Sequence, residues 1–419
     1  MPERYIVLAI PAFFLLIGLE LAATRLLGRD DYRLADSVND LSCGVLDQLL
    51  EAFLKVLALG GYIFIYEKAR LFDPPARAAL VWAACFLGVD FLYYWFHRLS
   101  HEVNAFWAAH VVHHQSEEFN LSVALRQGTF QNVFSWIFYL PLALLGFPPL
   151  MFVTCAAVNT LYQFWIHTRA IGKLGPLEWV LNTPSHHRVH HACNPKYIDR
   201  NYAGTLIVWD RLFGSFVEED EEPAYGITKP LRSWNPVWAN LHYWVELGQQ
   251  ARRITRGGDR LRLLLARPGW RPMELGGFQP APEVSRATQR RFATPLPRAL
   301  AAYAFAQFVV VLLAAAVLLF AQDSVSRGAL LAGAVAIVSS LVVVGGLFER
   351  KPWARTAEAA RLAAAAAAAG MWISAGGGAP ALAATALCLA SLAWLSKQRG
   401  WEEAAATATA TATSPSTSA

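Results

Sequence analysis

The histidines of this 419-residue chain are concentrated in one region. All eleven lie between His97 and His242, and ten of them lie between His97 and His191. Neutral imidazole is a ligand for iron, zinc, copper and nickel. Because chance scatter would spread these side chains along the chain, their concentration indicates a metal centre.

Eight of the histidines form three clusters with helical spacing. The first cluster has the pattern HxxxH, and the second and third have the pattern HxxHH. Residues at i, i+3 and i+4 share one face of a helix, so each cluster presents two or three imidazoles together. Zinc takes at most four protein ligands, so eight imidazoles exceed one ion and indicate two. The clustered ligand candidates are His97, His101, His110, His113, His114, His187, His190 and His191.

Three histidines lie outside this pattern. His167 ends an apolar segment at the same predicted membrane face as the clusters, so we include it as a ninth candidate ligand. His186 directly precedes the third cluster, and His242 lies far beyond it. We interpret His242 as a structural residue.

Acidic side chains beside the clusters are candidates to support the metal centre. Metal-bound imidazoles usually donate their second N–H to a carboxylate or a carbonyl. Thr183 or Ser185 could cap the helix that carries the third cluster. The acidic candidates are Asp90, Glu117 and Asp199 as partners of the histidines, and Glu102 and Asp210 as catalytic residues.

Uses of histidine that do not involve a structured metal centre fit the sequence less well. A tag, a metal buffer or a pH sensor would have a flexible run of histidines, not spaced clusters among aromatic residues. A zinc hydrolase is not indicated because the HExxH motif is absent. A histidine-rich metal transporter stays a minor alternative, since its ligands would lie inside the membrane spans and not beyond their ends.

Composition indicates a membrane protein. The chain is 55% hydrophobic and 16% charged, whereas soluble domains are about a quarter charged. The net charge is only +5, and no basic cluster accompanies a nucleic-acid motif, so we expect no nucleic-acid partner. The five cysteines are scattered without a CxxC motif, which argues against a disulfide framework or a thiolate metal site.

The apolar segments predict an all-α, polytopic membrane protein with a histidine-rich two-metal cap at one membrane face. We expect a catalytic domain at 1–255, a linker at 256–298, a C-terminal transmembrane region at 299–396 and a disordered tail at 397–419. The predicted spans are 5–27, 43–66, 78–96, a hairpin of 132–146 and 149–166 broken by Phe147-Pro148-Pro149, 300–321, 329–348, 359–374 and 380–395.

Charges refine this topology. Four basic residues lie between two of the C-terminal spans, namely Arg350, Lys351, Arg355 and Arg361. The positive-inside bias then puts the histidines on the cytoplasmic side. Asp47, Glu51 and Lys55 share one face of the second span, where we expect an internal ladder of ion pairs.

Oxygen activation by iron accounts for a two-metal, histidine-rich site at a membrane surface. Such chemistry needs electrons, open coordination positions and exclusion of water. A site between membrane helices is open to an alkyl or acyl chain from the bilayer. The sequence therefore favours oxidation of a lipid C–H bond by O2, and the spacing does not separate hydroxylation from desaturation.

Two long segments carry a family resemblance. They are YYWFHRLSHEVNAFWAAHVVHHQSEEFNLSVALRQ and YQFWIHTRAIGKLGPLEWVLNTPSHHRVHHACNPKYIDRNYAGTLIVWDRLFGSF, supported by RPGW and PEV in the linker. The chain resembles the fatty acid hydroxylase/sterol desaturase superfamily of membrane di-iron enzymes, and within it the alkylglycerol monooxygenases. The resemblance covers about residues 40 to 320, and the extra C-terminal spans fit that branch.

The resemblance implies a cytosol-facing di-iron centre held by the eight clustered histidines, with His167 added. Relatives have a further histidine where this chain has Gln163, so no ligand is expected there. The implied reaction hydroxylates the ether-bearing carbon of an alkylglycerol and releases a fatty aldehyde. It implies O2, a bilayer lipid and an electron donor, either tetrahydrobiopterin, with which Glu102 is associated, or a redox protein. The alternatives are a sterol desaturase or oxidase and a fatty-acyl hydroxylase.

Overall fold

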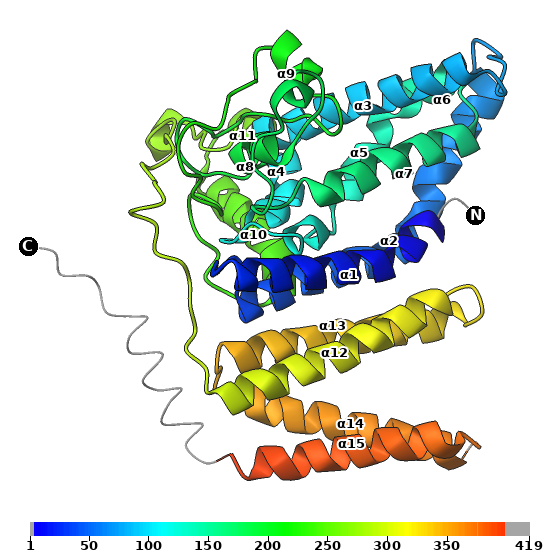
Figure 1. Cartoon of the computed structure of the whole chain (residues 1–419), viewed down its shortest axis with the longest axis vertical. Helices are drawn as coiled ribbons and strands as arrows, with labels where there is room; N and C mark the ends of the chain where they lie inside the picture. The colour runs from blue at the N-terminus through cyan, green and yellow to red at the C-terminus, as the bar shows by residue number, and fades with distance from the viewer. Residues whose placement is uncertain (1–3, 375, 399–419) are drawn as a thin grey trace, which may run out of the picture. The chain divides into compact units, whose positions relative to one another are not determined.

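The computed structural model describes residues 4–374 and 376–398, without the side chains of residues 4–9 and 55–58 (Figure 1). Every regular element in this part of the chain is a helix, and the only extended pairings there are two isolated bridges, Leu181 with Leu206 and Ala192 with Tyr225. The predicted all-α class is confirmed. Of the predicted tail, only Lys397 and Gln398 are described, and the rest lies outside the described residues.

The chain divides into two compact units. Unit 1 comprises Met1–Arg232 and Val237–Phe292, and unit 2 comprises Ser233–Pro236 and the chain from Ala293 onwards. The helices in chain order are α1 (Arg4–Leu26), α2 (Leu34–Ala69), α3 (Ala79–Glu102), α4 (Asn104–His110), η1 (Val111–His114), η2 (Val123–Leu125), α5 (Gln131–Phe138), α6 (Leu140–Leu144), α7 (Pro149–Trp165), η3 (Gly175–Trp179), α8 (Pro184–His190), α9 (Val208–Leu212), α10 (Pro236–Arg253), α11 (Gly257–Leu265), η4 (Met273–Leu275), α12 (Arg298–Phe320), α13 (Arg327–Phe348), α14 (Ala354–Ser374) and α15 (Gly378–Ser396).

The long helices of unit 1 pack around an apolar core. Tyr62 of α2, Cys85 and Val89 of α3, Leu142 of α6 and Met151 of α7 are all buried in one cluster. Burying such side chains away from water stabilises the packing by about 1.5–3 kcal/mol for each large one. The cluster ties the N-terminal half of α3 to α2, α6 and α7.

The predicted hairpin of unit 1 is present, but its first arm is broken. Tyr139 separates α5 from α6, and Pro141 lies in the first turn of α6, where a missing N–H costs nothing. Gly146 then turns the chain with a φ of 85°, and a Cβ there would lie 1.9 Å from the Phe72 carbonyl oxygen. The chain therefore returns along α7 towards the histidines.

Four helices among the described residues are long and apolar enough to cross a membrane, namely α3, α12, α13 and α15. A fifth is α2, which bends by 41° between Leu54 and Leu59. The span predicted at 359–374 lies within the helix α14, which carries Glu358 and Arg361 and is not among these helices. α7 has 17 residues and is likewise not among these helices.

Two smaller expectations concern the linker and the second span. The predicted linker contains α11 and η4, and Leu263 of α11 packs in a buried cluster with Ala108, Leu247 and Ile254. In the predicted ladder of α2, Asp47 and Glu51 both accept hydrogen bonds from Gln48, at 3.3 and 3.0 Å. The third member of that ladder is one of the residues whose side chains are not described.

Unit 2 is built from α12, α13, α14 and α15, each packed on the next along the chain (Figure 1). A polar cluster lies inside it. Tyr303 donates to Glu358 at 2.6 Å, and Arg361 pairs with the same carboxylate at 2.7 Å. Because every charge in the cluster is paired, it can be tolerated inside an apolar bundle, where it joins α12 to α14.

Candidate metal centre

The nine candidate histidines lie on five neighbouring segments of unit 1, and all nine are buried. These segments gather at one end of the long helices (Figure 1). The ligand candidates lie at the C-terminal end of α3 (His97, His101), at the end of α4 (His110), in η1 (His113, His114), after α7 (His167), in α8 (His187, His190) and at its C-cap (His191).

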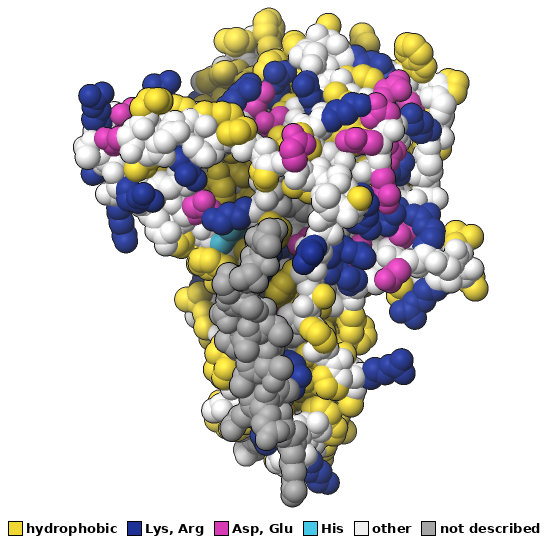
Figure 2. Space-filling view, turned by 90° about the vertical axis from the view of Figure 1, so that its left-hand side faces the viewer, with side chains coloured by type: hydrophobic (Ala, Val, Ile, Leu, Met, Phe, Trp, Pro, Cys, Tyr) yellow, Lys and Arg dark blue, Asp and Glu magenta, His cyan; other side chains and the backbone are white. Residues whose placement is uncertain are grey.

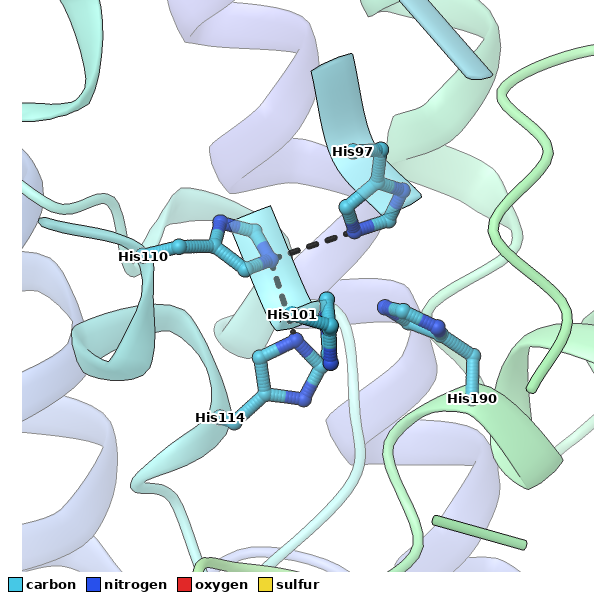
Figure 3. Close-up of side chains that lie close together, drawn as sticks. All are labelled: His97, His101, His110, His114 and His190. Carbon is cyan, nitrogen blue, oxygen red and sulfur yellow. Dashed lines mark hydrogen bonds between the residues drawn. The ribbon is translucent and has the colours of Figure 1, made fainter. Parts of the chain in front are cut away.

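The rings form two groups, each able to hold a metal ion. Group A contains five histidines and group B contains four, and within each group one ring nitrogen per residue lies within 4.8 Å of all the others. Figure 3 shows the rings of group A around a common space, with His110 between His97 and His114. Group A is His97, His101, His110, His114 and His190; group B is His113, His167, His187 and His191.

Adjacent histidines in the sequence enter different groups. His113 lies in group B and His114 in group A, while His190 lies in group A and His191 in group B. The two groups are neighbours, since the His114 and His191 rings stack with centroids 4.5 Å apart. The HxxHH clusters are therefore shared between two sites rather than each serving one.

Hydrogen bonds behind the rings fix their orientation. In group B, His113 and His167 each donate Nδ1–H to a backbone carbonyl, that of Arg126 at 2.7 Å and that of Gln163 at 2.7 Å. Their Nε2 atoms, which in neutral rings carry only a lone pair, face each other at 3.3 Å. Two lone pairs at this distance repel unless a cation lies between them, so this donor set fits a metal ion.

Group A repeats this arrangement. His97 donates Nδ1–H to the Tyr202 carbonyl at 2.7 Å, and His110 Nδ1 contacts Gln131 Oε1 at 2.6 Å. The Nε2 atoms of the two rings are 3.1 Å apart. Two imidazoles on one ion, each at about 2.1 Å, have nitrogens about 3–4.2 Å apart. The buried Nε2 atom of His190 has no hydrogen-bond partner, which leaves another lone pair for the same ion.

Burial keeps these rings neutral. Loss of solvation lowers the pKa of His113 to about 4 and that of His190 to about 3. Hydrogen bonds to the Arg126 and Arg200 carbonyls oppose this shift without cancelling it. At neutral pH both rings therefore have the uncharged, metal-binding form.

A buried arginine behind group B was not predicted. The guanidinium of Arg126 donates to Asn39 at 2.6 Å, to Asp40 at 3.2 Å and to Gln115 at 2.6 Å. Its own backbone carbonyl accepts from His113. Arg126 therefore anchors the segment after η1 to α2 and orients a group B ring. The only sequence signal for it was a single charged residue within the LSVALRQ run.

Two buried carboxylates position the loop behind His97. Asp210 accepts from the backbone N–H groups of Tyr202 and Ala203, both at 2.8 Å. Asp90 accepts from Thr205 N at 2.8 Å, and also from Leu206 N, Asn159 and Trp209. Asp90 was expected to contact a histidine directly, but it fixes the loop whose Tyr202 carbonyl orients His97. Burial raises the pKa of Asp210 to about 6.

The remaining acidic candidates differ in their placement. Glu102 pairs with Arg98 and with Arg267, each at 3.2 Å. Asp199 lies 3.6 Å from His101 Nδ1, which is beyond hydrogen-bond distance. Glu117 instead accepts from the backbone of Phe292 and pairs with Arg33, away from the rings.

Three other residues singled out in the sequence, at α8 and α10, lie outside the two groups. Thr183 occupies the N-cap of α8, as predicted, but its hydroxyl donates to Glu178 at 2.9 Å rather than to the helix. His186 belongs to neither group and lies with its ring against Phe216. His242 on α10 also lies outside both groups.

This fold and site define a class: a helical membrane protein whose buried histidines form two adjacent metal-binding groups. A family model described as fatty acid hydroxylase matches residues 82–215, which include all nine histidines. Alkylglycerol monooxygenase of Homo sapiens is 40% identical over 360 residues, 85% of this chain and 80% of that protein. The proteins of the same name from Xenopus tropicalis and Danio rerio are 38% and 43% identical, over 85% and 67% of this chain and 80% and 64% of theirs.

The chain therefore belongs to the fatty acid hydroxylase family, in its alkylglycerol monooxygenase branch. It is a multi-pass membrane enzyme that uses O2, an electron donor and a lipid substrate as a monooxygenase, and its histidine clusters are consistent with iron. The resemblance seen in the sequence is confirmed. No solved structure matches the chain.

Proposed function

We propose that the nine histidines hold two iron ions, one in group A and one in group B, and that the enzyme hydroxylates the ether-bearing carbon of an alkylglycerol. Two observations together carry this proposal. The structure has two adjacent histidine groups, and the chain is similar to an alkylglycerol monooxygenase over 85% of its length. When bound, the iron pair supplies the electrons and open coordination positions that O2 activation needs.

The protein's own groups orient the ligands and exclude water. Carbonyls behind His97, His113, His167 and His190 accept from Nδ1 and leave each Nε2 directed into its group. Complete burial keeps the imidazoles neutral and dry, which strengthens electrostatic interactions within the site. Asp210 acts on this centre through the loop at Tyr202, so we assign it as a positioning residue.

The reaction balances with an external two-electron donor. One oxygen atom enters the C–H bond, the other leaves as water, and two electrons and two protons come from the donor. The hydroxylated ether carbon is a hemiacetal, which breaks down to a fatty aldehyde and a glycerol derivative. We propose tetrahydrobiopterin as the donor, and Glu102, beside His101, as a catalytic residue associated with its use.

We also propose that the histidine end of unit 1 lies on the cytoplasmic side. Figure 2 shows that end face on, with Lys, Arg, Asp and Glu side chains spread over its surface, as expected outside a bilayer. Arg350, Lys351 and Arg355, between α13 and the body of α14, support this orientation through the positive-inside bias.

The test is a product assay in membranes. Membranes that contain the chain are supplied with an alkylglycerol, O2 and tetrahydrobiopterin, and fatty aldehyde is measured. We expect aldehyde from the wild type and none from His190→Ala. A hydroxylated acyl chain or an oxidised sterol from the corresponding lipids, without aldehyde from alkylglycerol, would instead assign the enzyme to one of the other two substrate classes.

A further inference from the structure

A cavity lies within unit 1 next to group A. Its volume is ≈ 360 Å³, within the range of small-molecule sites, about 300–1,000 Å³. Helices α4 and α10 and the segment after α11 supply one side of its walls, which is rich in aromatic rings, and residues 227–231 supply the other wall. The principal wall residues are Asn104, Trp107, Trp238, His242, Tyr243 and Trp270.

One aromatic ring separates this cavity from the candidate metal ligands. Trp107 lines the cavity, and its ring centroid lies 5.0 Å from that of His101 and 5.5 Å from that of His114. Both histidines belong to group A. A molecule that stacks on the cavity face of Trp107 would therefore be in contact with group A through a single side chain.

The wall around Trp107 is held in place by hydrogen bonds. Tyr243 donates to Asn104 Oδ1 at 2.7 Å, and Asn104 Nδ2 donates to the Leu263 carbonyl at 2.8 Å. These bonds join α10, α4 and α11. A site preformed in this way loses less free energy to ordering when a ligand binds.

The rim of the cavity is charged. Lys229, Glu246 and Arg271 line it, and a second hollow of ≈ 270 Å³ shares these residues and adds Arg253. An alkyl chain gains little from such a rim, because apolar contact would desolvate the charges. Aromatic walls with a polar, mostly basic rim fit a planar, water-soluble heterocycle.

We propose that this cavity binds the reductant of the reaction, a planar heteroaromatic two-electron donor, and that Trp107 carries its electrons to group A. The inference rests on the proposed function, which requires a donor of two electrons and two protons for each O2 consumed. The donor is oxidised, one oxygen atom is reduced to water, and the other enters the substrate. The lipid then approaches group A by another route.

The test fills the cavity from α10. Val245 lines the cavity and is 41% exposed, so Val245→Trp adds bulk at a tolerant position. Leu241→Trp is the matched control, since Leu241 is on the same helix, is 39% exposed and is not among the lining residues. Thr228→Trp, from the other wall, is the second filling variant, and iron content verifies that each variant is intact.

Reduction of the oxidised, iron-loaded protein is followed anaerobically by stopped-flow absorbance without lipid. The donors are tetrahydrobiopterin, reduced flavin mononucleotide and the small ion dithionite. Because no lipid is present, the result does not depend on which lipid the enzyme oxidises. We expect Val245→Trp to raise the half-saturating concentration of at least one planar donor about tenfold, with dithionite reduction unchanged and Leu241→Trp like the wild type.

Several outcomes would overturn the proposal. The first is the same half-saturating donor concentration in Val245→Trp and Leu241→Trp. The second is a wild-type protein that is reduced by neither planar donor. The third is a filling variant whose KM for the lipid rises while its reduction by the donors stays normal. Trp107→Leu should slow reduction by planar donors at saturation, whereas Trp107→Phe, which keeps a ring, should retain most of the rate. Equal rates in these two variants would contradict the role of Trp107.

Discussion

A chain of hydrogen bonds links Asp210 to His97 through the backbone of Tyr202, and this relay gives the sharpest single-residue prediction. Asp210 is completely buried and accepts from Tyr202 N, Ala203 N and the Ser215 hydroxyl at 2.8, 2.8 and 2.7 Å. The Tyr202 carbonyl in turn accepts from His97 Nδ1. Asp210→Asn preserves the shape of the side chain but replaces one acceptor oxygen with an NH2 group, which faces a donor. We expect the loop and the His97 ring to shift.

The size of the effect follows from the lost bonds. A hydrogen bond to a charged group contributes about 1.5–3 kcal/mol, and a buried N–H left without a partner costs about 1–3 kcal/mol. A loss of about 2–3 kcal/mol corresponds to a roughly 30- to 150-fold change in an equilibrium constant. Substitution of residues that hydrogen-bond to metal-bound histidines typically weakens metal binding or activity by about 10- to 100-fold. The change expected for Asp210→Asn is of the same size.

The assay is iron affinity, measured by competition with a chelator, together with turnover. We expect Asp210→Asn to bind iron more weakly, while Asp220→Asn, at a surface carboxylate with a side chain 54% exposed, binds it normally. Wild-type iron affinity together with lost turnover would refute the positioning role and make Asp210 catalytic. Wild-type affinity and wild-type turnover would refute the relay altogether.

Three further predictions concern packing, metal identity and unit 2. A Cβ at Gly128 would lie 2.0 Å from the Ala109 carbonyl oxygen, so Gly128→Ala should destabilise unit 1 by about 1–3 kcal/mol and lower its iron content. Gly172→Ala is the control, since a Cβ there meets nothing within 4 Å. Equal melting temperatures of the two variants would contradict this prediction. Activity removed by a chelator should return with Fe²⁺ but not with Zn²⁺, and full recovery with zinc would exclude redox chemistry at the site. Glu358→Ala leaves Arg361 without its buried partner and should lower the stability of unit 2 by about 3 kcal/mol in chemical unfolding, with iron content unchanged; loss of iron would show that the ion pair matters to the metal centre.

The helical fold and the set of nine neighbouring histidines follow from local patterns. Apolar runs and i, i+3, i+4 spacing are short-range signals, and the segments that carry them are helical. The division of the clusters between two groups is not a local signal. His113 and His114 lie in a 3-10 helix after α4, so they do not continue the face that ends at His110.

Partners that depend on long-range contacts were also missed. Asp90 is on the expected face of α3, but its acceptor positions are filled by a loop more than 110 residues later in the sequence. Arg126 binds Asn39 and Asp40 on α2, which no spacing rule connects to it. Ring-orienting contacts of this kind require the tertiary fold.

The most direct test of the central claim is the metal content of the purified wild type and of two single variants. His190 belongs to group A and His113 to group B. We predict about two iron ions per chain in the wild type, one for each group, and a loss of iron and of O2-dependent activity in both His190→Ala and His113→Ala. A single zinc ion that survives both substitutions would contradict the account.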